Sequence, residues 1–466
     1  MTQSEVDTSD GLPSPRRIWA IAAISFGTAL LVMDGSIANV ALPTIARELK
    51  VSEGAVTSVV TVYQLVMVMV LLPFAAVGDR VGHRRFYQVG LTLFCLASLF
   101  CLFVESFAAL LLLRAGQALG AGMSLSVAAA MLREIYPAKA LGSGLGFNSV
   151  VVASAAAISP TLGGFVVAHA AWQYVFVLAA PLAVISLALS RALPDPRPRP
   201  TDADWIGGIW SALTVALLIG GLQLSTHVAS LPVGIGAALA GAISAVVLVR
   251  REKKRDRPIV PVDLWAMPVI GLSALAAAAV FCATGAVMIS LPFLFEQGLG
   301  FAPDEVGLLL MPFPATLLVI SPLAGWLSDR FAPSKLGVPG LLVAICGMLL
   351  LAFMPRDVGS LDIAWRLSLT AAGIGFFLAP NSRLLISSAP KDRTAAAGST
   401  ISTSRLLGQT TAAAAVGVLL SLGMGLGPAP LIFAAGLAAL AAACSMVRYK
   451  TARAQRVAKD AADSGL

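Results

Sequence analysis

The chain has 466 residues, of which 58% are hydrophobic and 12% charged, and its mean hydropathy is +0.87. A soluble domain carries about 25% charged residues, so this composition excludes an ordinary soluble enzyme, a disordered protein and a disulfide scaffold. The formal net charge is +8, which we ascribe to the basic cytoplasmic loops of a membrane protein rather than to nucleic-acid binding.

Apolar runs of the roughly 20 residues needed to cross a bilayer recur along the whole chain. They predict fourteen transmembrane helices in an all-α polytopic membrane protein. The runs occupy residues 18–44, 55–77, 86–104, 107–132, 141–168, 172–193, 205–226, 231–249, 268–295, 304–327, 337–354, 363–389, 396–423 and 428–447. The first run is too long for a signal-peptide core and no small-residue cleavage site follows it, so we expect a retained first helix.

Basic residues are distributed unequally between the two sides of this topology. With the N-terminus in the cytoplasm, 25 of the 32 Lys and Arg residues fall in cytoplasmic loops and tails, and three fall on the opposite side. The positive-inside rule therefore predicts that both termini are cytoplasmic and that the number of spans is even. We expect the membrane to be a bacterial cytoplasmic (inner) membrane. The basic run at 250–257 is interpreted as a topology anchor, with a lipid-headgroup patch or a nuclear signal as the alternatives.

Two segments of the chain resemble each other, PFAAVGDRVGHRR at 73–85 and PLAGWLSDRFAPSK at 322–335. They place Asp79-Arg80 after the second predicted helix and Asp329-Arg330 after the tenth. This spacing pairs helices 1–6 with helices 9–14, and parallel repeats of this kind are typical of transporters. The predicted organisation is a cytoplasmic tail (1–17), a six-helix bundle (18–193), a linker with two extra transmembrane helices and the basic loop (194–267), a second six-helix bundle (268–447) and a cytoplasmic tail (448–466).

Two local motifs resemble those of the major facilitator superfamily, and in it the fourteen-helix drug:proton antiporter branch. MDGSIANVALP at 33–43 is similar to L-D-x-T-x-x-N-x-A-L-P, with Ser36 in place of Thr. The loop after the second predicted helix is similar to G-x-L-x-D-R-x-G-R-K. It departs from that pattern at Ala75, Val77 and His83, and the matching residues are Asp79, Arg80, Gly82 and Arg84.

Two further motifs support the same resemblance. LLLRAGQALGAG at 111–122 is similar to R-x-x-Q-G through Arg114 and Gln117, although Ala118 stands where Gly is usual. AAAISPTLGG at 155–164 is similar to the antiporter motif G-x-x-x-G-P-x-x-G-G, with Ala155 and Ser159 replacing glycines. The resemblance implies the major facilitator fold of two six-helix bundles plus two linker helices. It also implies conformational gating by Asp79, Arg80, Gly82, Arg84, Pro160, Gly163 and Gly164. For Asp79, Arg80 and Arg84 the alternative is a tight polar turn that serves only the positive-inside topology.

Asp34 is the only one of the 24 acidic residues that lies deep inside an apolar run. A carboxylate there costs at least about 2.5 kcal/mol, so it should face a cavity or a partner. The low dielectric disfavours its charged form and lets it exchange a proton near neutral pH. We predict proton coupling and substrate binding at Asp34. The alternative is a buried, neutral Asp that is hydrogen-bonded to Ser36 or Asn39.

Arg114 is a permanent cation inside an apolar run, so it needs an anionic or carbonyl partner. The resemblance implies a role in proton coupling, and the alternatives are snorkelling to the interface or a packing ion pair. Arg383 and Arg405 are weaker candidates because they lie near predicted cytoplasmic helix ends. Arg366 is explained by an i,i+4 pair with Asp362.

Other polar residues in or beside the apolar runs are candidate substrate contacts. Glu296 ends the ninth predicted helix on the outer side, where it would attract cationic substrates to the cavity mouth or be merely interfacial. With Asp34, the predicted substrate-binding residues are Asn39, Tyr63, Gln64, Asn148 and Glu296.

Motifs of enzymes and metal sites are missing from the sequence. There is no GxxxxGK[ST], no HExxH and no CxxC, and the three histidines and five cysteines are scattered. We therefore expect no enzyme activity, no metal and no cofactor, and a driving force supplied by the proton gradient.

These observations together predict a monomeric multidrug exporter in the lipid bilayer that does not bind nucleic acid. It would exchange protons for lipophilic, cationic toxic compounds by alternating access. Three alternatives stay open: an exporter of an endogenous metabolite such as a siderophore, amino acid or lipid; a non-transporting membrane sensor or assembly factor; and a channel. The presence of Asp34 argues against the sensor, and the isolation of this one deep acidic residue argues against a channel.

Overall fold

The computed structural model describes residues 11–13, 15–136, 141–194, 205–225, 230–255, 261–328, 330–355, 357–390 and 394–463. The regular secondary structure within these ranges is helical. The α-helices are α1 (Arg16–Glu48), α2 (Glu53–Val56), α3 (Ser58–Val81), α4 (His83–Phe100), α5 (Phe107–Ile135), α6 (Leu141–His169), α7 (Tyr174–Val177), α8 (Ala180–Leu189), α9 (Trp205–Leu224), α10 (Leu231–Glu252), α11 (Val262–Trp265), α12 (Pro268–Phe293), α13 (Pro303–Leu310), α14 (Pro312–Leu327), α15 (Pro333–Ala352), α16 (Ser360–Ser387), α17 (Thr394–Ser421) and α18 (Ala429–Asp463).

Twelve helical segments in the described residues are long and apolar enough to cross a membrane. All-helical spans are expected because lipid offers no hydrogen-bond partners to the backbone. The two extra helices of the predicted linker, α9 and α10, are among the twelve. The sequence predicts fourteen spans, and the two that are missing from these twelve correspond to α6 and α17. These helices contain 29 and 28 residues. In α17, a polar stretch from Ser399 to Thr411 lowers the hydropathy.

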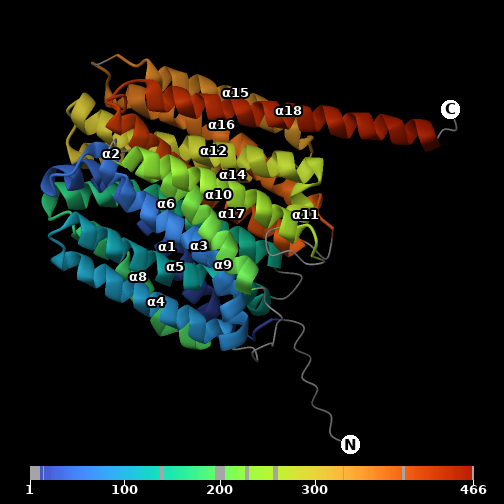
Figure 1. The fold of residues 1–466 in the computed structure, drawn as a ribbon, viewed down its shortest axis with the longest axis horizontal. Helices are drawn as coiled ribbons and strands as arrows, with labels where there is room; N and C mark the ends of the chain where they lie inside the picture. Colours follow the sequence, from blue (N-terminus) through green and yellow to red (C-terminus); the bar gives the residue numbers. More distant parts are fainter. Residues whose placement is uncertain are drawn as a thin grey trace, which may run out of the picture.

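The long helices form two groups that lie side by side (Figure 1). In the first group, α1, α3, α4, α5, α6 and α8 pack on one another, and in the second α12 and α14–α18 do so. One close helix crossing repeats between the groups. Gly90 of α4 faces Gly120 of α5, and Gly340 of α15 faces Gly373 of α16; a Cβ atom at any of the four would clash with backbone atoms of the partner helix. Gly90 and Gly340 have the same sequence separation as Asp79 and Asp329, and Gly120 and Gly373 differ from that separation by three residues, so the crossing repeats close to the predicted offset. Asp329 itself lies outside the described residues.

The helix pair α9 and α10 lies on the outside of both groups. α9 packs against α3 of the first group and α17 of the second. The Gln223 side chain of α9 donates to Ser58 Oγ at 2.9 Å and accepts from Thr61 Oγ1 at 3.2 Å. Leu239 and Ile243 of α10 are at least 60% exposed, as expected for a lipid-facing surface. The pair therefore covers one seam between the two groups of helices.

The last helix differs from its predicted boundary. The sequence predicts a span that ends at residue 447, followed by a cytoplasmic tail, but α18 continues to Asp463 and extends beyond the body of the molecule in Figure 1. Arg448, assigned to that tail, is 3% exposed. Its Nη1 donates to Ser273 Oγ at 2.6 Å and to Asn381 Oδ1 at 2.7 Å. These polar partners on α12 and α16 explain why a basic residue is tolerated inside the second group.

Candidate functional site

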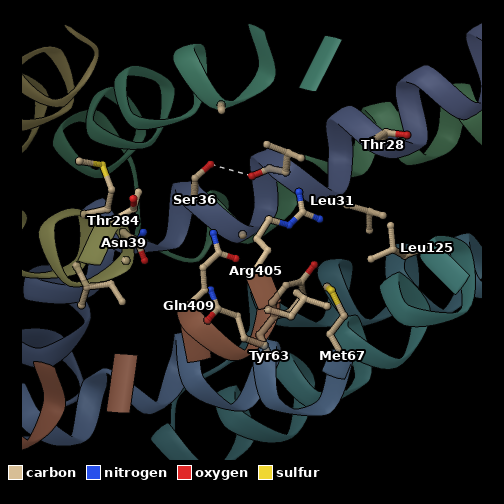
Figure 2. A pocket seen from close by; sticks show the side chains of 18 residues that line it. Thr28, Leu31, Ser36, Asn39, Tyr63, Met67, Leu125, Thr284, Arg405 and Gln409 are labelled. Carbon is tan, nitrogen blue, oxygen red and sulfur yellow. Dashed lines mark hydrogen bonds between the residues drawn. The ribbon is translucent and has the colours of Figure 1, made fainter. Parts of the chain in front are cut away.

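A cavity of about 230 Å³ lies between the two groups of helices (Figure 2). α1, α3, α5 and α6 line it from the first group, and α12 and α17 from the second. Its wall is mostly apolar, with polar groups on α1, α3, α12 and α17. The lining residues are Thr28, Leu31, Val32, Gly35, Ser36, Asn39, Tyr63, Gln64, Met67, Leu125, Ala156, Thr284, Gly285, Met288, Ile289, Arg405, Leu406 and Gln409.

An ion pair between Asp34 and Arg114 is buried beside this cavity. Nη1 of Arg114 donates to both carboxylate oxygens of Asp34, at 3.1 Å and 2.9 Å. The side chains are 0% and 1% exposed, respectively. The two residues are 80 positions apart in the chain and come from α1 and α5. Of the alternatives open at Asp34 and Arg114, the structure therefore shows a buried ion pair. Ser36, the suggested partner of Asp34, instead donates to the Val32 carbonyl at 2.8 Å.

Neutral groups surround the rest of the Arg114 guanidinium. Nη1 also donates to Gln117 Oε1 at 2.8 Å, and Nε donates to the Val59 carbonyl at 3.3 Å. The Tyr63 ring centroid lies 4.2 Å from Cζ and the Phe176 centroid 5.1 Å, so the cation is stabilised by two aromatic faces. Because an arginine cannot lose its proton, such a set of partners is what a buried guanidinium requires.

Tyr63 connects the ion pair to the cavity. Its ring lies over the Arg114 guanidinium, and the same residue lines the cavity wall. A change in the charge of Asp34 would therefore act on Arg114, on the ring stacked over it, and through that ring on the cavity wall.

The structure brings some of the predicted substrate residues together and separates others. Asn39, Tyr63 and Gln64 line the cavity. Asp34 does not, because it is fully buried against Arg114, and the prediction of a cationic substrate had relied on a carboxylate at this surface. Glu296 is also separate from the cavity and is ion-paired with Arg47. Asn148 belongs to α6, but its side chain lies outside the described residues.

Two cavity residues on α17 were missed by the sequence analysis as substrate contacts. Arg405 was placed near a cytoplasmic helix end, yet its side chain extends from α17 into the cavity in Figure 2. Gln409 lies one helical turn further along and lines the same cavity. Polar residues four positions apart share a helix face. That spacing is the signal that could have identified this pair.

Several predicted gating residues lie where helices meet or turn. Gly82, between α3 and α4, has a φ of 103°, a region that favours glycine. Asp79 accepts a hydrogen bond from Nε2 of His83 at 2.8 Å, within the first group of helices. Arg80 is exposed and Arg84 is half-buried in the first turn of α4.

The α6 motif lies at a crossing between the two groups of helices. A Cβ atom on Gly164 would clash with the Pro303 carbonyl, and one on Gly307 would clash with the Pro160 carbonyl. A Cβ atom on Gly163 would clash with the Ile37 side chain of α1. Glycine permits this close approach, which joins α6 to α13 at the end of the molecule where Arg47 meets Glu296.

Two packed groups of membrane-spanning helices around a central cavity with a buried ion pair define a transporter architecture. The chain belongs to the Major Facilitator Superfamily, whose family profile matches residues 24–409 and, in a second match, 273–464. A bacterial homologue of the human lysosomal transporter Spinster, solved in an inward-facing, unoccupied conformation, has the same fold with a TM-score of 0.69. The two are 16% identical, and the match covers 94% of this chain and 99% of that one.

Three curated relatives are named as transporters or resistance proteins. The uncharacterized transporter YebQ of Escherichia coli (strain K12) is 38% identical over 94% of this chain and 96% of its own. The riboflavin transporter RibZ of Clostridioides difficile (strain 630) is 26% identical over 82% of this chain and 84% of its own. The multidrug resistance protein Stp of Mycobacterium tuberculosis (strain CDC 1551 / Oshkosh) is 27% identical, with 87% and 76% coverage.

Proposed function

We propose that this chain is a proton-coupled exporter of toxic amphipathic small molecules that works by alternating access. The observation that carries the proposal is the buried ion pair between Asp34 and Arg114 beside the cavity. Relatives named as a multidrug resistance protein and as a drug efflux pump support an export function.

The ion pair has the properties of a proton switch. When Asp34 takes up a proton, the pair is broken and Arg114 is left as a buried cation without its counter-ion, which is unfavourable by several kcal/mol. The first group of helices then favours an arrangement in which Arg114 finds other partners. Since Tyr63 touches both Arg114 and the cavity, occupancy of the cavity and protonation of Asp34 are energetically coupled.

The proposed topology has fourteen spans, namely the twelve described above together with α6 and α17. Excess Lys and Arg in the alternate loops orient both termini toward the cytoplasm of a bacterial inner membrane. In this orientation Arg47 and Glu296 lie on the outer side. The ion pair between them and the α6–α13 crossing then hold the outer side closed, as expected of an inward-facing state. We propose that the protein acts as a monomer, without a metal or cofactor.

The experiment uses purified protein in proteoliposomes that contain a pH-sensitive dye. A pH gradient is imposed, and efflux is followed for a panel of cationic, neutral and anionic fluorescent amphiphiles. We expect gradient-dependent efflux of at least one member, and its loss in Asp34→Asn at equal reconstitution. Asp362→Asn is the matched control because Asp362 is partly exposed and paired with Arg366 away from the cavity. Wild-type efflux by Asp34→Asn would rule out the proposed role of the carboxylate.

Export of an endogenous metabolite is the second candidate. Its support is the polar part of the cavity, where Arg405, Gln409, Gln64 and Asn39 offer hydrogen-bonding groups to a ligand of defined polarity. Counterflow with cell extract in place of the dye panel distinguishes the two candidates, because a metabolite exporter is saturated by the extract and a drug exporter is not.

A further inference from the structure

Arg405 places a cation in the central cavity, and no carboxylate among the described residues is paired with it. The Arg405 side chain extends from α17 into the cavity and points toward α1 (Figure 2). Within the part of the chain that the structure describes, its guanidinium has neither an ion pair nor a hydrogen bond. The cavity wall, over the same residues, includes no Asp or Glu.

The acidic residue on the neighbouring part of α1 does not neutralise this charge. Asp34 gives both carboxylate oxygens to Arg114 and is not in the cavity wall. The two charges of that pair cancel each other, so Arg405 leaves the cavity with a net positive charge. A cation in a membrane protein faces a water-filled space or a partner. The planar guanidinium fork matches the two oxygens of a carboxylate, sulfonate or phosphate.

Two amide oxygens in the same wall have no hydrogen-bond partner among the described residues. Oδ1 of Asn39 and Oε1 of Gln64 are buried and accept no hydrogen bond from the described residues. Buried polar atoms are normally paired, so a ligand that donates an N–H or O–H group would satisfy them. Leu31, Met288 and Ile289 supply an apolar surface beside these groups.

We infer that the cavity binds an amphipathic organic anion, with the anionic group on Arg405, hydrogen-bond donors on Asn39 and Gln64, and an apolar body against the remaining wall. This inference rests on the proposed function only in assigning the cavity to the transported substrate. It replaces the lipophilic cation expected from the sequence with a ligand of opposite charge.

The test measures equilibrium binding to purified, detergent-solubilised protein at constant pH, without any gradient. The probes are isosteric sets built on benzene, naphthalene and pyrene, each with a carboxylate, a sulfonate, an alcohol or a methylammonium group. We expect wild-type protein to bind anions at least about tenfold more tightly than the matching cations, as for a charge-assisted hydrogen bond. Arg405→Gln should remove that preference. Arg405→Lys should retain part of it, since the charge remains and the fork is lost.

A charge-reversal variant keeps the inference falsifiable if one substitution perturbs folding. Arg405→Glu should reverse the order and favour the methylammonium probes. Arg366→Gln is the matched control because it removes another guanidinium of the second group, paired with Asp362 and away from the cavity, and it should bind as wild type does. Equal or tighter binding of the cations by wild type, or unchanged anion binding in Arg405→Gln, would overturn the inference.

The outcome is separable from that of the proposed function. Charge-selective binding that depends on Arg405, without gradient-driven efflux, would refute proton-coupled export and leave the ligand class intact. Gradient-driven efflux of cations that is unaffected by Arg405→Gln would refute the anionic ligand class and leave proton-coupled export intact.

Discussion

Arg47 in the last turn of α1 and Glu296 in the π-helical turn after α12 (η6, Leu294–Gly298) form an ion pair that joins the two groups of helices. The Glu296 side chain is 6% exposed and that of Arg47 is 56% exposed. Because water reaches one partner, the interaction is screened and contributes about 0–1 kcal/mol. A contact of this strength can hold one end of the molecule closed and still open during a transport cycle.

Glu296→Gln should increase the open population at this end by up to about fivefold, which corresponds to the loss of that ion pair. The measurement is electron–electron double resonance between spin labels on Glu48→Cys and Ala302→Cys in a background without the five native cysteines. A larger fraction of long distances is expected. Asp304→Asn is the control because it removes a charge at the same end, where the described residues contain no ion-pair partner for it. Identical distance distributions in wild type and Glu296→Gln would contradict a closing role.

Asp34→Asn and Arg114→Gln should each lower the thermal unfolding midpoint, and the double variant should lose less than the two changes added together. Each single change leaves a buried group without its partner, at a cost of up to about 3–5 kcal/mol. Asp34→Asn should remain folded because Arg114 keeps the Gln117 side chain, the Val59 carbonyl and the Tyr63 ring. The midpoints are measured in detergent with a thiol-reactive fluorophore. Combining Arg114→Gln with Asp79→Asn provides the additive comparison, and strict additivity for Asp34 would mean that the pair is not coupled.

Gly164→Ala should slow transport by about five- to a hundredfold without weakening binding of a cavity ligand. The new methyl group would clash with the Pro303 carbonyl and with Gly307, and overpacking of this kind costs about 1–3 kcal/mol. The clash destabilises the conformation in which α6 and α13 are close together, so the transport cycle slows. The cavity wall is unchanged, so binding is not weakened. Transport rate and equilibrium binding are measured on the same preparation. Gly220→Ala on α9 adds the same methyl group with no atom within 4 Å and should have no effect on either quantity.

Cysteines introduced along residues 209–222 of α9 should react slowly with a maleimide that does not cross the bilayer. This helix packs against α3 and α17 and contributes no residue to the described cavity wall, so its thiols face protein or lipid, where the reactive thiolate is disfavoured. Asn39→Cys and Gln409→Cys, which line the cavity, should react at least about tenfold faster. Labelling along 209–222 at the rate seen at position 39 would place α9 in the translocation path.

Much of the fold follows from the sequence because the bilayer limits the possible structures. Lipid enforces helices wherever the chain crosses it, so apolar runs alone located the twelve spans found in the described residues, including the extra pair α9 and α10. The same restriction identified Asp34 as a candidate functional residue, since a single carboxylate in an apolar run is costly unless it has a function or a partner. The motif at 33–43 indicated the family, and the repeated Asp-Arg turn indicated the internal repeat. The helix α18 continues past residue 447, where the span was predicted to end, and Arg448 is held by Ser273 and Asn381, which no local pattern reveals.

The composition of the site was decided by tertiary structure. The local sequence around Asp34 does not predict that its carboxylate pairs with Arg114, 80 residues away, instead of facing the cavity. Arg405 was discounted because its distance from the helix end was read from hydropathy, whereas its place in the cavity depends on how α17 is rotated against α1 and α3. Polar residues occupy consecutive positions of α17 at 402–405 and 409–411, so they fall on several faces of the helix and give little periodic signal to fix that rotation. The packing of one helix group on the other fixes it, and with it the charge that the cavity presents to a ligand.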